Sequence, residues 1–174
     1  NQIFITNDEL ETTLCPMPTH FGHGLIGNCL SPLLIGKNLI LMPGNDLSYV
    51  LKLGEIIDKY KISFLSSVPS FWKLAIRGNT PTKNSLKRIN IGSAPLSTSF
   101  WQDVIEWSNI TNVSNMYGIT ETANWISGAS AIHYTPEDGL VGRMWGGYAA
   151  VKNNNGSIIS EGEGELLICS PALM

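Results

Sequence analysis

The sequence predicts an α/β fold, in which a largely parallel sheet is flanked by helices and followed by a β-rich C-terminal flank. From residue 22 onward, short apolar runs of strand length alternate with segments whose apolar residues follow the helical period. Such alternation requires crossover connections between strands and therefore predicts parallel pairing. After Gly118 the pattern changes to short strands separated by turns rich in Gly and Asn.

The first expected elements are a helix over residues 25–35 and a buried strand over residues 39–42. Gly36 ends the helix, because glycine adopts the left-handed conformation of a helix C-terminus at little cost. A second helix is expected over residues 48–60, where Ser48 is a suitable cap and the apolar residues form one stripe.

The remaining elements follow in the same alternation. Pro69 suits the first turn of a helix, where no amide donor is needed, and Ser97 is a suitable cap. We expect helices over 69–76 and 97–107, and strands over 62–65, 86–91, 113–116, 125–132, 147–152, 157–159 and 165–168. Residues 1–120 are expected to form the α/β part, and residues 121–174 a β-rich flank of the same domain.

The composition excludes several classes of protein. The 174 residues are 43% hydrophobic and 14% charged with a formal net charge of -3, so no basic excess favours a nucleic-acid partner. The most apolar window, 25–42, contains Asn28, Pro32 and Lys37, and no membrane span is expected there. Three cysteines are too few for a secreted disulfide framework, which favours a cytoplasmic location.

A glycine pattern raises one alternative function. Residues 22–27 match the G-x-G-x-x-G pattern of dinucleotide-binding proteins, and Asp46 follows at about the spacing of their ribose-binding acid. The preceding residues 12–18 contain two prolines where that fold needs a central strand. We therefore favour glycines that let a helix pack closely, with an NAD(P)-dependent oxidoreductase as the alternative.

Cysteine and histidine side chains in the same region raise the question of a metal site. Cys15, His20, His23 and Cys29 are all zinc-ligand types. They are spread singly along the chain, whereas a tetrahedral site needs two close pairs separated by a loop. No metal cage is expected from them.

Two segments that directly follow predicted strands contain residue types suited to binding a nucleotide. Ser93, Ala94 and Pro95 are small enough to let a flat ring lie against the backbone. Residues 115–122 combine an aromatic ring, a glycine, a hydroxyl and a carboxylate, as a nucleotide with bound Mg²⁺ requires. Ligands in open parallel sheets bind at the carboxyl ends of strands, where both segments are expected. The alternative for residues 93–95 is a plain strand-to-helix turn, and the alternative for residues 115–122 is a solvated loop.

These segments resemble motifs of the adenylate-forming enzymes, which include acyl-CoA synthetases, luciferase-like ligases and peptide-synthetase adenylation domains. Tyr117-Gly118-Ile119-Thr120-Glu121 is similar to their Y-G-x-T-E motif, and Gly92-Ser93-Ala94-Pro95-Leu96 to their G-G-A-P-L segment. Further matches in the right order are residues 18–36 (a gate ending in L-x-x-G), 64–70 (a strand ending in V-P), 139–143 (G-x-V-G-R) and 162–166 (G-E-L).

The resemblance implies an ATP-dependent acid–thiol ligase. A carboxylic acid is activated as acyl-AMP, and the acyl group then passes to CoA or to the phosphopantetheine of a carrier protein, with ATP and Mg²⁺ as cofactors. The family's phosphate loop, ribose-binding Asp and catalytic Lys have no counterpart in this sequence. We therefore expect an internal fragment of the large N-terminal domain of a two-domain enzyme, inactive without the remainder of its own polypeptide.

The resemblance also implies roles for individual residues. Tyr117 would stack on adenine with Ser93, Ala94 and Pro95 against the other face, and Asn115 and Gly118 would complete the nucleotide site. Thr120 would hold a phosphate oxygen and Glu121 the Mg²⁺, which makes them the expected catalytic residues. The expected acid pocket consists of His20, Phe21, Gly92 and Gly118.

The nature of the acid is only indicated by what the gate segment lacks. Amino-acid-activating members of the family hold the substrate ammonium with an Asp near this segment, and no Asp or Glu occurs between Thr12 and Gly44. Because an unpaired buried ammonium is costly, we favour an acyl or aryl acid. An amino-acid-activating domain and a non-catalytic nucleotide-binding or scaffold relative remain alternatives.

Overall fold

The computed structural model describes residues 5–44, 47–83 and 85–174. Seven strands form a main sheet in the order β2-β1-β3-β4-β5-β6-β7, and three strands form a second sheet in the order β10-β8-β9. The first five strands in the main sheet are parallel, whereas β6 and β7 are antiparallel to their neighbours. The predicted α/β class with a largely parallel sheet is confirmed.

The bounds of the elements are as follows. The main sheet consists of β1 (Thr12–Cys15), β2 (Asn38–Leu41), β3 (Phe64–Ser67), β4 (Arg88–Gly92), β5 (Val113–Gly118), β6 (Trp125–Ser130) and β7 (Arg143–Met144). The helices are η1 (His23–Leu30, π-helical), α1 (Ser31–Leu34), α2 (Leu47–Leu51), α3 (Leu53–Tyr60), α4 (Pro69–Ala75), α5 (Thr98–Ser108) and η2 (Thr120–Thr122, 3₁₀). The second sheet consists of β8 (Tyr148–Lys152), β9 (Ile158–Ile159) and β10 (Glu165–Cys169).

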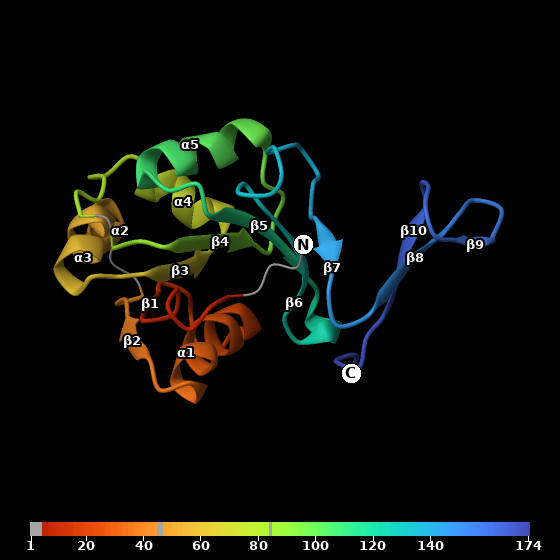
Figure 1. Ribbon diagram of the computed structural model, residues 1–174, viewed down its shortest axis with the longest axis horizontal. Helices are drawn as coiled ribbons and strands as arrows, with labels where there is room; N and C mark the ends of the chain where they lie inside the picture. Colours follow the sequence, from red (N-terminus) through yellow and green to blue (C-terminus); the bar gives the residue numbers. More distant parts are fainter. Residues whose placement is uncertain (1–4, 45–46, 84) are drawn as a thin grey trace.

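Helices cover both faces of the main sheet. Figure 1 shows α4 and α5 above the sheet, and the red and orange segment with η1 and α1 below it. Leu65, Ile89 and Ile91 point to the upper face, where they form a core with Trp72 and Trp101. Because side chains alternate along a strand, the residues between them face the opposite layer.

That lower face carries buried polar side chains beside apolar ones such as Phe64 and Met116. Ser66 and Asn90 are buried there, and the Asn28 amide of η1 donates to the Ser66 carbonyl at 3.1 Å. This bond connects η1 to β3 across the layer boundary. Gly92, two residues after Asn90, faces the same layer, and the indole of Trp125 packs closely against it.

Several local expectations are corrected. Residues 12–15 form a strand between β2 and β3, because Pro16 and Pro18 come just after it and remove no donor from its ladder. The expected helix over 48–60 is two helices that meet at Lys52, and Ser48 lies inside the first of them. Ser97 is a true cap, since its hydroxyl accepts from the Phe100 amide at 3.3 Å. Asp46 lies outside the described residues.

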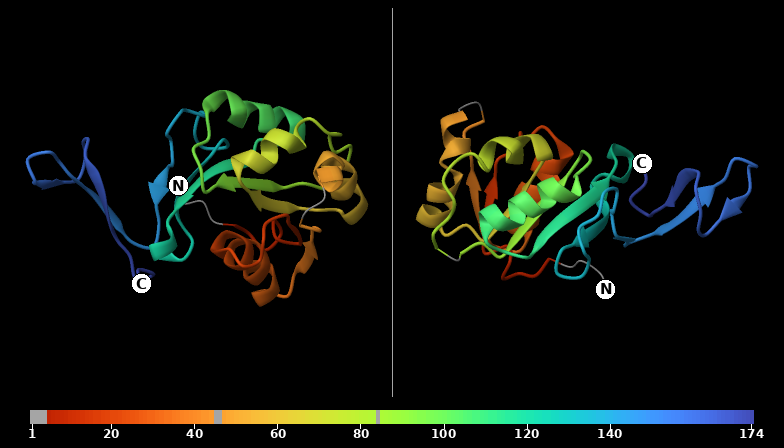
Figure 2. Two further views of the ribbon diagram at one scale, coloured as in Figure 1. Left: turned by 180° about the vertical axis from the view of Figure 1, so that it is seen from behind. Right: turned by 90° about the horizontal axis from the view of Figure 1, so that it is seen from above.

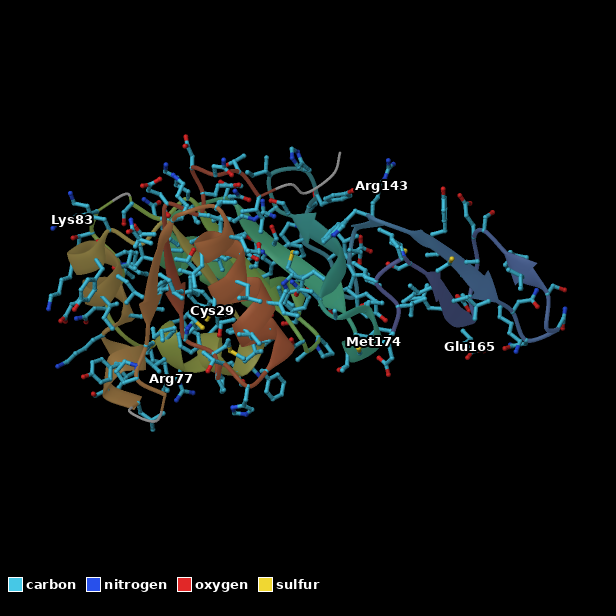
Figure 3. The ribbon with its side chains drawn as sticks, turned by 90° about the horizontal axis from the view of Figure 1, so that it is seen from below. Cys29, Arg77, Lys83, Arg143, Glu165 and Met174 are labelled. Carbon is cyan, nitrogen blue, oxygen red and sulfur yellow. The ribbon has the colours of Figure 1, made fainter. Side chains whose placement is uncertain are left out.

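The second sheet extends away from the main body, as both views of Figure 2 show. Tyr148 and Ile158 on this sheet are 82% and 68% exposed. In Figure 3, Glu165 lies on this projecting sheet, whereas Cys29 lies within the main body. The division expected near residue 120 stays a prediction, and β6 and β7 continue the main sheet beyond it. No helix in the described ranges is both long enough and apolar enough to cross a bilayer.

Candidate functional site

Two cavities meet at the carboxyl ends of β4 and β5. One has a volume of about 330 Å³ and the other about 450 Å³, and Ser93 and Gly118 line both of them. The smaller cavity also contacts the segment that leads into α5, whereas the larger one contacts the start of η1. They therefore lie toward opposite faces of the sheet and adjoin at the carboxyl ends of its strands, where parallel sheets bind ligands.

The smaller cavity contains the residues predicted for the nucleotide. Its walls include Ser93, Ala94, Pro95, Asn115, Tyr117 and Gly118. Tyr117 is half-buried, so its ring is held in the wall while remaining accessible from the cavity. The Asn115 amide donates to the Leu140 carbonyl at 2.8 Å, which fixes that side chain against the loop after β6.

The larger cavity contains the predicted phosphate and metal residues. Thr120 and Glu121 lie in its wall together with Phe21 and Gly118. Glu121 is exposed, and none of the ion pairs among the described residues involves it. A carboxylate that is open to a cavity and not neutralised by the described cations is a suitable Mg²⁺ ligand when phosphates supply the remaining oxygens.

Clusters of protein ligands do not offer an alternative metal site in the described ranges. No group of three or more His, Cys, Asp and Glu side chains there is arranged to hold an ion. Burial raises the pKa of the Cys15 thiol to about 12, so this thiol stays protonated near neutral pH.

His23 is the most constrained polar residue of the larger cavity. Its Nε2 atom lies 2.8 Å from the Ser66 hydroxyl, and its Nδ1 atom lies 3.2 Å from the Ser93 hydroxyl. Burial lowers its pKa to about 4, so the imidazole is neutral at physiological pH. A neutral ring between two hydroxyls forms an uncharged polar floor for the cavity.

Backbone geometry at the rim explains the small residues found there. Ser93 adopts a left-handed φ of 66°, a conformation that favours glycine, and the family's motif has glycine at this position. The bond from its hydroxyl to His23 accompanies this strained backbone. Gly118 is required by close approach, because a Cβ there would overlap the Asn124 carbonyl oxygen.

The structure separates two of the predicted acid-pocket residues from both cavities. His20 is exposed and lies edge-on to Phe21 at 5.8 Å, whereas His23, three residues later, is in the cavity wall. Gly92 lies behind the wall, under the indole of Trp125. Sequence reasoning missed His23, Asn124 and Trp125; an available signal was the aromatic residue shortly after the Y-G-x-T-E motif.

Comparison with known proteins decides the family. A family model described as AMP-binding enzyme matches residues 2–174. The chain belongs to the AMP-binding enzyme family. The resemblance stated from the motifs is therefore confirmed, and the oxidoreductase alternative loses its support.

The relatives are much longer proteins, of which this chain spans about a third. The curated 4-coumarate--CoA ligase-like 3 of Arabidopsis thaliana is 23% identical over 171 residues, which are 94% of this chain and 30% of that protein. The N-terminal domain of FACL13 from Mycobacterium tuberculosis matches with a TM-score of 0.80 and 23% identity, over 94% of this chain and 41% of that one.

A third similar structure was solved with ligands. O-succinylbenzoate Coenzyme A Synthetase (MenE) from Bacillus subtilis, in complex with ATP and magnesium ion, matches with a TM-score of 0.79 and 21% identity. The match covers 99% of this chain and 35% of that one. At this identity the similarity shows a shared fold, and the chain spans about a third of that protein.

Proposed function

We propose that this chain is the central part of an ATP-dependent ligase that activates a carboxylic acid as acyl-AMP and transfers the acyl group to a thiol. The observation that carries the proposal is the pair of cavities joined at Ser93 and Gly118, with Tyr117 in one and Glu121 in the other. A nucleotide that spans this junction has its base on one face of the sheet and its phosphates on the other.

In this arrangement the smaller cavity binds adenine. The half-buried Tyr117 ring stacks on one face of the base, and the backbone of Ser93 to Pro95 covers the other face. Stacking of a base on an aromatic ring contributes about 1–3 kcal/mol. Neither group carries a charge, so this contribution is largely independent of salt.

The larger cavity then holds the phosphates and the acid. The Thr120 hydroxyl donates to a phosphate oxygen, and the Glu121 carboxylate holds the Mg²⁺ that offsets phosphate charge when it is bound. The acid carboxylate attacks the α-phosphorus, a P–O bond forms, and pyrophosphate leaves. The chain's residues contribute mainly by positioning the two reactants.

The walls of the larger cavity favour an acid without an ammonium group. Glu121 is the one acidic residue among those that line it, and it is assigned to Mg²⁺. A substrate ammonium would therefore lack a carboxylate partner, which disfavours the amino-acid-activating alternative. Names of relatives that contain CoA ligase or Coenzyme A Synthetase support CoA as the acceptor, with phosphopantetheine on a carrier protein as the second possibility.

Acid-dependent ATP–pyrophosphate exchange by the full-length protein tests the proposal. We expect exchange that requires Mg²⁺ and falls about 5- to 150-fold in Tyr117→Ala, since a lost stacking contact of about 1–3 kcal/mol corresponds to that range. Glu121→Ala is expected to lose Mg²⁺-dependent exchange. Tyr148→Ala and Glu165→Ala, on the projecting sheet, are matched controls and should exchange normally.

Nucleotide binding without exchange for any acid would favour the scaffold alternative. Exchange that survives both Tyr117→Ala and Glu121→Ala would contradict the assigned roles.

A further inference from the structure

We infer that the indole of Trp125 closes the inner end of the acid pocket, so that the enzyme accepts compact acids and rejects long-chain ones. The inference rests on the proposed function and concerns the same larger cavity, in whose wall Trp125 lies. It assigns a specificity-determining role to a residue that follows the nucleotide motif and does not bind the nucleotide.

The indole occupies space that a side chain would otherwise fill. A Cβ added at Gly92 would lie 2.6 and 2.8 Å from two carbons of the Trp125 ring. Gly92 ends β4 directly below the rim of the cavity. The absence of a side chain there leaves a space, and the structure fills this space with the indole rather than leaving it open to a ligand.

The opposite side of the ring is held by η1. A Cβ at Gly27 would lie 3.7 Å from the indole nitrogen, and the His23 ring lies edge-on to the indole with centroids 4.6 Å apart. His23 is itself fixed by its bonds to Ser66 and Ser93. The indole therefore lies between β4 and η1 and contacts a ring that cannot rotate freely, which makes it a fixed wall.

An irregularity in the strand pairing places the ring there. Tyr117 pairs with Ser127, but the next residue, Gly118, pairs with Trp125, so β6 carries one residue more than β5 at this point. Such a bulge redirects a side chain at the end of a strand and is common beside active sites. The start of β6 is thereby brought under the two-cavity junction.

Two consequences follow for the acid. The carboxylate of the acid must reach the phosphates near Thr120 and Glu121. The hydrocarbon part of the acid then points toward His23 and Trp125, which line the same cavity. A long chain would meet the fixed indole, whereas a short one would end on the neutral imidazole and the ring edge. Because one methylene too many in a fitted pocket changes discrimination by about 10- to 200-fold, the length limit should be steep.

Exchange kinetics with a ladder of straight-chain acids tests the inference on the full-length protein. We expect kcat/KM of the wild type to fall by at least about 10-fold per methylene beyond its optimum. Trp125→Ala should move the optimum to longer acids by several methylenes, and Trp125→Phe by fewer. Trp145→Ala is the matched control, because Trp145 is also half-buried but lies in neither cavity wall; its optimum should not move.

A second measurement separates this inference from the proposed function. Binding of non-hydrolysable acyl-AMP analogues of graded chain length is measured by calorimetry for the same four proteins. If no acid supports exchange, the proposed function fails, and the inference is then decided by whether the length limit for binding moves in Trp125→Ala. A wild type that prefers long acids, or a length limit that is equal in wild type and Trp125→Ala, would overturn the inference.

Discussion

The buried imidazole of His23 makes the stability of this domain depend on pH in a way that can be calculated. Burial lowers its pKa from 6.5 to about 4, and the residue is 7% exposed. In the unfolded chain the same group has an ordinary pKa, so between these two values the unfolded state binds more protons than the folded state. Stability is therefore fully present above about pH 6.5 and is lost as the pH falls toward 4.

The size of the effect follows from the two pKa values. A difference from 6.5 to about 4 corresponds to about 3 kcal/mol of stability at neutral pH that is absent at pH 4. Carboxylates whose pKa values are lowered, such as Asp138 with its bonds to Thr98, lose their contribution only at still lower pH. His23 therefore dominates the window between the two values.

Urea unfolding of the full-length protein at several pH values between 7 and 4 measures the effect. We expect the free energy of unfolding to fall across this window in the wild type and to change much less in His23→Gln. His20→Gln is the matched control, because His20 is exposed, and it should keep the wild-type slope. A wild type with no loss of stability in this window, or His23→Gln with an undiminished slope, would refute the reasoning.

Three further variants test separate contacts of the site. Gly92→Ala should lower the free energy of unfolding by about 1–3 kcal/mol, because its Cβ would approach the Trp125 ring and the Met116 carbonyl oxygen; a urea midpoint unchanged from the wild type would contradict this packing. Asn28→Ala removes the amide that joins η1 to Ser66 and should cost about 1 kcal/mol by the same assay; an unchanged urea midpoint would contradict a stabilising role for this bond. Tyr117→Phe keeps the ring and should retain nucleotide affinity in calorimetry within about 3-fold, whereas equal losses in Tyr117→Phe and Tyr117→Ala would argue against stacking.

The alternating part of the fold was predictable from the sequence because α3, α4 and α5 bury apolar side chains in the core formed with the strands. Leu65, Ile89 and Ile91 form the upper core with Trp72 and Trp101, as the periodic pattern requires. Strand β1 was missed because prolines follow it directly, although they lie beyond its last ladder bond. The two-residue strand β7 is too short to give a periodic signal.

The lining of the smaller cavity, which we propose to bind the nucleotide, was predictable because most of its residues are consecutive. Ser93 to Pro95 directly follow β4, and residues 115–121 run from the end of β5 into η2, so a motif records each set together. Of the residues predicted for the acid, Phe21 and Gly118 line the larger cavity, whereas His23 and Trp125 were not predictable in this way. His23, Ser66, Ser93 and Trp125 come from four separate segments, and only the folded sheet brings the imidazole, the two hydroxyls and the indole into contact.

The most direct test of the nucleotide site is a crystal structure of the full-length protein with ATP and Mg²⁺. We predict adenine stacked on the Tyr117 ring and covered by Ser93 to Pro95, with the metal on the Glu121 carboxylate and the phosphates in the larger cavity. A base bound outside the smaller cavity, or a metal that does not contact Glu121, would contradict the assignment.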